Sequence, residues 1–95
     1  MVLVRAAKNG HEDLVRDLLG NGAEVNGKDR DGRTALWEGA SNGHGNVIKL
    51  LLENRAEVDS KSNDGRTPLS VAASTGHVAV IQPLLNNGAE IDSKK

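Results

Sequence analysis

Apolar residues along the chain recur in short groups at helical spacing, and glycine and polar turn residues separate the groups. The clearest group lies in residues 11–19, where Leu14, Val15, Leu18 and Leu19 form one apolar stripe at the period of an α-helix. A shorter group of small apolar residues precedes it and ends at a glycine, which can take positive φ. The amino-terminal part therefore predicts two short helices joined by a tight turn.

Polar turn residues dominate the next segment, residues 23–32, which surrounds one apolar anchor, Val25, with Asn, Asp and Gly. This composition is typical of an extended turn. The same order of helix, glycine, second helix and long turn then occurs twice more, and the last turn falls on residues 89–92. The helices expected in these later units span residues 34–42, 47–53, 67–75 and 78–87.

A constant spacing of 33 residues relates the three units. The stretch from Asp64 to His77 has a counterpart from Asp31 to His44, and a shortened counterpart that ends at His11. Such a period indicates a repeat architecture in which each unit buries its apolar face against its neighbours. We expect one domain over residues 1–95 whose first unit lacks its leading turn, with repeats at about 1–31, 32–64 and 65–95.

The third unit carries a family pattern, which reads Gly65-Arg66-Thr67-Pro68-Leu69, then Gly76-His77, then Gly88-Ala89-Glu90-Ile91-Asp92. With this pattern in register three times, the chain resembles the ankyrin repeat family over its whole length. The resemblance implies an all-α solenoid of helix-turn-helix units joined by long β-turn loops. It also implies a module that binds another protein, not an enzyme.

Three departures from the family pattern predict local weakness. The family's Thr-Pro-Leu-His ends in Trp37 in one unit and in Ser70 in the next, so the histidine that ties adjoining loops in the family is absent twice. Gly39 replaces an alanine at a cost of about 1 kcal/mol in helix propensity. Pro83 costs ~3 kcal/mol in a straight helix, which predicts that the last helix is kinked or starts late.

Composition narrows the class of partner. The 12 Lys and Arg residues nearly balance the 13 Asp and Glu residues, with both signs scattered and only one Trp as an aromatic residue. A nucleic-acid binder should show a basic stripe and aromatic stacking platforms instead. Cysteine is absent, which excludes disulfides, thiolate nucleophiles and Cys-ligated zinc.

The chain also shows no targeting or membrane signal. The apolar run at Met1–Arg5 is too short for a signal peptide, and no later run approaches the ~20 residues that span a bilayer. We therefore expect an intracellular protein, cytoplasmic or nuclear, that binds another protein and neither nucleic acid nor a membrane.

Metal and catalytic sites are not predicted. His11, His44 and His77 occupy equivalent positions, and such positions in stacked helices lie about 8 to 10 Å apart, whereas zinc needs nitrogens ~2 Å from one centre. We expect no metal and no cofactor, and interpret each histidine as opening a second helix and hydrogen-bonding nearby backbone. Ser70 and Ser74 also occupy repeat positions, so the repeat accounts for them without a catalytic triad. No glycine pattern forms a phosphate loop.

Variable polar positions within the repeating frame predict the partner-binding surface. They fall at the loop tips and at the ends of the first helices, which match the family's usual contact sites. The predicted contact residues are Lys8, Asn9, Arg30, Asp31, Arg33, Trp37, Ser41, Asn42, Asn63, Asp64, Arg66, Ser70, Ser74 and Thr75. The alternative is that the polar members are simply solvated turn residues.

Some of these residues have a second interpretation. Trp37 is either an aromatic anchor for a partner or a residue packed against the next unit, and packing is favoured. Arg33 and Arg66 could be anion sites, but we expect each to steady a turn through Asp31 or Asp64. A weak candidate for asparaginyl hydroxylation is Asn26, by resemblance to substrates within the family.

Alternatives to native partner recognition stay open. The chain could be a designed or trimmed scaffold, or a slice of a longer array, because its last unit ends without a polar closing helix. We expect a monomer, with self-association at uncapped ends as the alternative. A hydrolase would need a base beside Ser70 or Ser74, and a nucleic-acid binder would show steep salt dependence.

Overall fold

The computed structural model describes residues 1–91, and within them the chain forms six helices and no strand. In chain order these are α1 (Val2–Lys8), α2 (Glu12–Gly20), α3 (Ala35–Ser41), α4 (Gly45–Glu53), α5 (Pro68–Thr75) and α6 (Val78–Asn86). The all-α fold is confirmed, and the boundaries expected for the last four helices are correct to within two residues. Of the last predicted turn, Asp92 lies outside the described residues.

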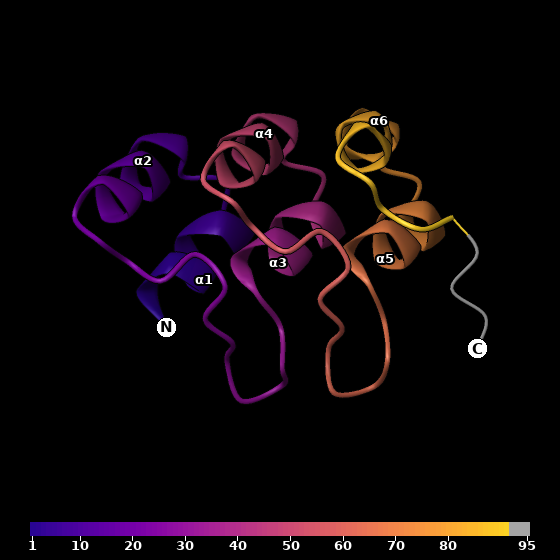
Figure 1. Ribbon diagram of the computed structural model, residues 1–95, viewed down its shortest axis with the longest axis horizontal. Coiled ribbons are helices and arrows are strands. Elements are labelled where there is room, and N and C mark those ends of the chain that lie inside the picture. Colours follow the sequence, from indigo (N-terminus) through magenta and orange to yellow (C-terminus); the bar gives the residue numbers. More distant parts are fainter. Residues whose placement is uncertain (92–95) are drawn as a thin grey trace.

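The helices form two rows (Figure 1). An inner row contains α1, α3 and α5, and an outer row contains α2, α4 and α6. The long loops after α2 and α4, residues 21–34 and 54–67, project from the inner row in the same direction. The resulting body measures 36 × 26 × 20 Å, so the three helix pairs follow one another along its longest dimension.

Threonine side chains start the second and third inner helices. Thr34 Oγ1 accepts a hydrogen bond from the backbone N–H of Trp37 at 3.1 Å. Thr67 Oγ1 accepts from Ser70 N–H at 3.1 Å, and Ser70 Oγ accepts in return from Thr67 N–H at 2.9 Å. Pro68 follows at the first helical position, where its missing N–H would have no partner in the helix. The predicted N-caps are confirmed, and the third unit has a complete capping box.

One continuous apolar core runs through all three helix pairs. Its largest fully buried members include Leu36, Ile48, Leu51 and Leu84. The inner helices approach one another closely because their contacts are built from small residues, such as the fully buried Ala7 and the other alanines of this row. None of the helices in residues 1–91 combines the length and hydropathy that a membrane crossing requires.

The predicted kink or late start at Pro83 is wrong. Helix α6 begins directly after His77 and continues unbroken through Pro83 to Asn86. The carbonyl that Pro83 leaves without a backbone donor belongs to Ala79, which is exposed, so water can satisfy it. The first turn is tightened, because the His77 carbonyl accepts from Val80, three residues on, at 3.2 Å.

Gly39 lies close to a side chain of the neighbouring helix. This glycine is buried in α3, and a Cβ there would lie 3.3 Å from Cδ1 of Ile48. The equivalent pair in the first unit is Ala6 with Val15, in which the alanine has the Cβ and the valine lacks the δ carbon. Ile48 packs closely against Gly39, and the third unit pairs an isoleucine, Ile81, with an alanine, Ala72.

Candidate functional site

Hydrogen bonds join the two projecting loops near their tips. The backbone N–H of Asn63 donates to the carbonyl of Asp31 at 2.9 Å, and its side-chain Nδ2 donates to the carbonyl of Arg30 at 3.0 Å. Gly32 lies against this contact with φ of +74°, and a Cβ there would be 2.8 Å from the backbone nitrogen of Asn63. The two tips therefore form one connected surface, in which Asn63 has a structural part.

A second tie recurs where each long loop begins. Asn26 Oδ1 accepts from the backbone N–H of Glu57 at 2.7 Å. Its counterpart in the next unit, Asp59, accepts through Oδ1 from the backbone N–H of Glu90 at 3.3 Å. The side chain of Asn26, the residue considered for hydroxylation, is therefore engaged between two units.

Trp37 connects the second inner helix to the following loop. Its side chain is almost wholly buried, at 4% exposure, and its indole Nε1 donates to the carbonyl of Arg66 at 3.1 Å. The absence of the family's histidine at this position predicted a weaker tie to the adjoining loop. The indole of Trp37 makes such a tie instead. The packed interpretation of Trp37 agrees with this burial, and the ring offers little surface to a partner.

Arg33 points inward toward a buried carboxylate. Its Nη1 lies 3.4 Å from Oε2 of Glu38, whose side chain is 6% exposed, and its guanidinium carbon lies 4.3 Å from the centroid of the Trp37 ring. The expected pairing with Asp31 is therefore wrong, because the guanidinium turns to the inner helix. Within the described part of the chain, Nε of Arg33 is buried without a hydrogen-bond partner. These contacts make Arg33 a residue that holds the loop onto α3.

Asp64 and Arg66 form the expected pair at the second tip. Arg66 Nε lies 3.8 Å from Asp64 Oδ2, with both side chains exposed. The hydroxyl of Ser62, which donates to Oδ1, holds the pKa of Asp64 below its ordinary value, and the positive charge of Arg66 adds to this effect. Both charged groups remain accessible to a partner.

The ends of the inner helices bring further predicted residues into one line along the row. Lys8 and Asn9 are exposed at the end of α1. Asn42 donates to the carbonyl of Glu38 at 2.8 Å, and Thr75 donates to the carbonyl of Val71 at 2.8 Å, so both are bonded to their own helices. Two serines complete the line at the ends of α3 and α5, Ser41 and Ser74.

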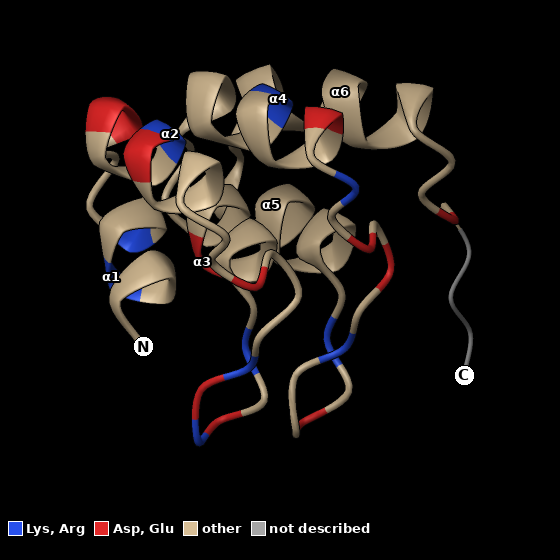
Figure 2. Ribbon diagram, turned by 60° about the vertical axis from the view of Figure 1, so that its left-hand side comes forward, with Lys and Arg blue, Asp and Glu red and all other residues tan. Residues whose placement is uncertain are grey.

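Charged residues lie on α1, on the outer helices α2 and α4, and along both projecting loops (Figure 2). The sequence interpretation did not include Arg5, which is exposed on α1 beside Lys8. A cleft of about 220 Å³ lies here, and Arg5 and Lys8 line it together with Asp29 of the first loop. The signal that could have found Arg5 is its spacing of three residues from Lys8, which places both on one side of a helix.

Two of the three histidines, His44 and His77, contact the preceding unit. The Nε2 of His44 donates to the carbonyl of Lys8 at 3.0 Å, as expected for a residue that bonds nearby backbone. The rings of His44 and His77 lie against Gly10 and Gly43 of the preceding unit, where a Cβ would approach the ring closely. Among residues 1–91, no group of three or more potential ligand side chains is placed to hold a metal ion.

Comparison with known proteins agrees with this architecture. A family model described as Ankyrin repeats (3 copies) matches residues 3–95. The match therefore includes all three helix pairs and both projecting loops. No curated protein matches the chain.

Proposed function

Because the chain belongs to the ankyrin-repeat family, we propose that it binds a partner protein through its loop tips and the exposed ends of its inner helices. Ankyrin repeats are generally protein-interaction modules without enzymatic activity.

The observation that carries the proposal is the connection between the two loops. Asn63 bonds to Arg30 and Asp31 across the tips, and Trp37 fixes the second loop to α3. A surface whose loops are already ordered loses less conformational entropy on binding than one with independent loops. The exposed side chains of these loops are therefore presented in a fixed arrangement.

Charge indicates the chemistry of the partner. Of the exposed charged residues on the loop tips and on α1, four are basic and two are acidic. The basic ones are Arg5, Lys8, Arg30 and Arg66, and the acidic ones are Asp31 and Asp64. This excess favours a partner whose contact segment is acidic, and such complementarity acts mainly on the rate of association and on specificity.

A pair of matched double variants tests the proposal. Proteins captured from cell extract by the immobilised chain are identified, and each candidate is then purified and titrated. We expect Arg30→Ala with Arg66→Ala to weaken binding by about tenfold or more, and Arg16→Ala with Lys49→Ala, on the outer row, to leave it within about twofold.

The opposite pattern would contradict the proposal. If the outer-row variant lost the partner while the loop variant retained it, the contact surface would lie on α2 and α4. All four substituted side chains are exposed, so both variants should fold normally. Circular dichroism of both variants checks this.

A further inference from the structure

The most exposed large apolar side chains lie at the two ends of the stack. Among the described residues they are Met1, Val2, Leu14, Val78 and Ile91, each between 41% and 80% exposed. The first three precede or belong to the first helix pair, and the last two belong to α6 or follow it. Exposed apolar surface is thus concentrated where a helix pair has a neighbour on one side only.

The repeat register defines the face at the amino end. Val2 is exposed, whereas its counterpart Ala35 is fully buried. Leu14 is exposed, whereas its counterpart Val47 is buried. In the second helix pair, the preceding pair covers the positions that correspond to Val2 and Leu14. The amino-end face comprises Val2, Arg5, Leu14, Asp17 and Leu18.

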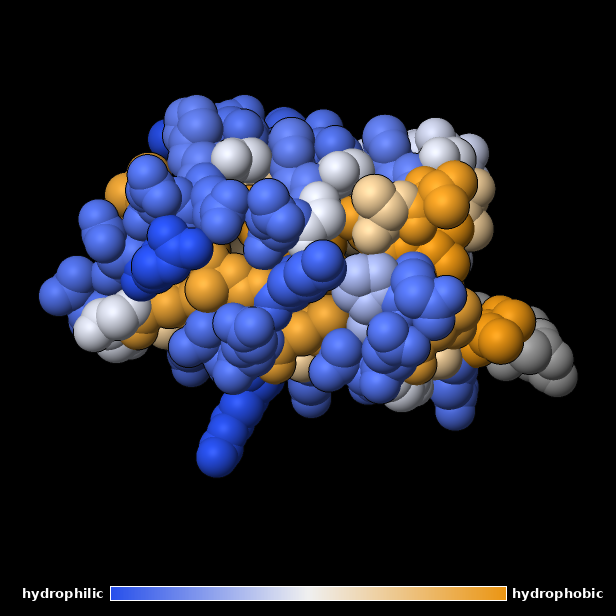
Figure 3. Space-filling model, turned by 90° about the horizontal axis from the view of Figure 1, so that it is seen from above, coloured by the Kyte–Doolittle hydropathy of each residue, from blue (hydrophilic) through white to orange (hydrophobic). Residues whose placement is uncertain are grey.

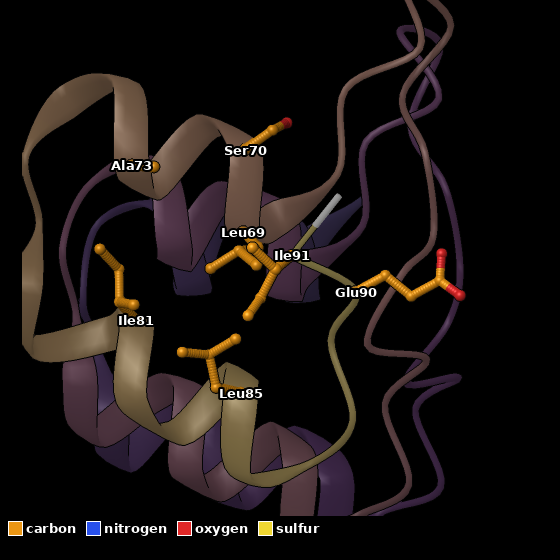
Figure 4. Close-up of a pocket in the computed structure, with 7 residues that line it drawn as sticks. All are labelled: Leu69, Ser70, Ala73, Ile81, Leu85, Glu90 and Ile91. Carbon is orange, nitrogen blue, oxygen red and sulfur yellow. The ribbon is translucent and has the colours of Figure 1, made fainter. Parts of the chain in front are cut away.

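The face at the other end combines a mainly apolar groove with polar residues, among them Ser70 and Glu90. Ala73 is exposed, although its counterpart Ala40 is fully buried by the next pair. Figure 3 shows hydrophobic residues gathered at this end of the molecule. A groove of about 260 Å³ lies between α5 and α6, with Leu69, Ile81 and Leu85 directed into it (Figure 4). The carboxyl-end face comprises the apolar residues Leu69, Ala73, Val78, Ile81, Leu85 and Ile91 and the polar residues Ser70, Ser74, Gln82, Asn86 and Glu90.

A face of this kind is covered twice inside the chain. In the inner row α1 packs against α3 and α3 against α5, and in the outer row α2 packs against α4 and α4 against α6. At each junction, the carboxyl side of one pair receives the amino side of the next. The residues of the carboxyl-end face are therefore the repeat counterparts of residues that, inside the chain, pack against the amino side of the next pair.

We propose that the carboxyl-end face of one copy of this chain binds the amino-end face of a second copy, in the geometry with which successive pairs stack. This contact uses the ends of the stack and not the loop tips, so it goes beyond the proposed function. The two proposals hold or fail independently.

The polar residue on α1 fits this arrangement. Arg5 corresponds to Glu38 in the second unit. Glu38 lines a cleft with Val4 and Lys8 of α1. The counterparts of Val4 and Lys8 in the third unit are Ser70 and Ser74. In the stacked pair of copies, Arg5 would therefore face two hydroxyl groups. A hydroxyl oxygen can accept from a guanidinium, so the charge need not lie against apolar surface.

The polar residue on α2 fits in the same way. Asp17 corresponds to Pro83, which lines a shallow cleft with three α4 residues, Lys49, Leu52 and Glu53. Their counterparts in the third unit are Gln82, Leu85 and Asn86, and the amide groups of Gln82 and Asn86 can donate to a carboxylate. Both charged residues of the amino-end face thus meet hydrogen-bonding groups on the second copy.

Two different faces make this contact, so it does not close on itself as a dimer. A heterologous contact leaves one free face of each kind, and further copies can add to both ends. Pairing of two carboxyl-end faces would instead give a closed dimer and leave Val2 and Leu14 uncovered. The expected species are therefore short, open-ended chains that grow with concentration.

Two blocked variants test the contact by sedimentation from about 10 μM to about 1 mM. Val2→Glu with Leu14→Glu blocks the amino-end face, and Val78→Glu with Ile91→Glu blocks the carboxyl-end face. Val2, Leu14 and Val78 lie in the first turn of a helix, where an acidic side chain is favourable. Asn46→Glu with Lys61→Glu, exposed in the middle pair and its loop, is the control.

We expect the unmodified chain and the control to grow past the dimer, and each blocked variant alone to remain monomeric. An equal mixture of the two blocked variants should form a heterodimer and stop there. A strictly monomeric unmodified chain over this range would overturn the proposal. So would an amino-blocked variant that dimerises by itself, because carboxyl-end faces would then pair with each other.

Discussion

The loops after α2 and α4 are closed by the same backbone hydrogen bond, but different side chains stabilise the two turns. In the first loop Asp29 N–H donates to the Arg33 carbonyl at 3.0 Å, and in the second Ser62 N–H donates to the Arg66 carbonyl at 2.9 Å. Asp29 Oδ1 also accepts from two backbone N–H groups, at 2.9 and 3.0 Å. Ser62 Oγ accepts from only one of the equivalent groups, Arg66 N–H, at 3.3 Å.

The starting positions of the two loops differ as well. Gly22 takes φ of +90° in the first loop, and its counterpart in the second loop is Arg55 with φ of +70°. A non-glycine residue in this region carries a steric cost that glycine avoids. The second loop is therefore strained where the first is not, and it depends more on a contact from outside, the indole of Trp37. Loops of one repeat pattern are thus held by different shares of contacts within the loop and contacts from outside it.

The largest expected effect comes from breaking the external tie. Trp37→Ala should lower the free energy of unfolding by about 3–5 kcal/mol, because it removes a buried ring and leaves the Arg66 carbonyl without its donor. Trp37→Phe should cost about 1 kcal/mol, since it keeps most of the ring and loses the hydrogen bond. Urea unfolding measures both. Equal losses for the two variants would show that the hydrogen bond, not the buried volume, dominates.

Removing the internal ties should separate the two loops. Asp29→Ala should cost about 1–2 kcal/mol, because two backbone N–H groups lose a charged acceptor, and Ser62→Ala should cost about 0.5–1 kcal/mol. Thermal and urea unfolding of the two variants side by side check this order. If Ser62→Ala were the more destabilising change, the second loop would be the one held more firmly by its own side chains.

Relieving the strained position should make the second loop resemble the first. Arg55→Gly is expected to raise the free energy of unfolding by about 1 kcal/mol, because the left-handed conformation then has no Cβ penalty. Arg55→Ala is the control, since it removes the same side chain but keeps the Cβ, and it should give no such gain. Stabilisation by both variants alike would point to charge instead of backbone conformation.

Acidification should produce the smallest effect, and it should act on the second tip. The pKa of Asp64 is lowered in the folded chain, chiefly by the Ser62 hydroxyl, so its contribution is present above the unfolded pKa and is lost as pH falls through the folded value. We expect Asp64→Asn to flatten slightly the fall in melting temperature in acid. An unchanged slope below about pH 4 would show that this carboxylate does not contribute.

The repeat period allowed most of the fold to be predicted. Register alone gave three helix pairs, and hydroxyl residues at a fixed offset gave the caps at Thr34 and Thr67. The effect of Pro83 could not be predicted, because it depends on whether the carbonyl four residues earlier faces water or protein. That property arises only once the units are stacked.

Which side chains at the loop tips are free to contact a partner could be predicted less completely, for a related reason. Spacing identifies side chains near the loop tips, but it does not reveal which of them bond to the protein itself. Arg33 turns inward to Glu38, and Asn63 bridges the loops, whereas Arg30 and Asp31 have exposed side chains. The sequence does contain a signal for the strained position, because the counterparts of Arg55 in the other two units, Gly22 and Gly88, are both glycine.

The close contact between Gly39 and Ile48 has a consequence for exchanging parts between repeat proteins. Grafting the sequence of α1 onto α3 alone would place an alanine Cβ 3.3 Å from the δ carbon of Ile48, tighter than ordinary van der Waals contact. Transplanting α1 together with α2 would bring Val15 along with Ala6 and avoid the conflict. Moving the helix pair together therefore avoids a close contact that moving the single helix would create at Ile48, where the side chain would have to shift.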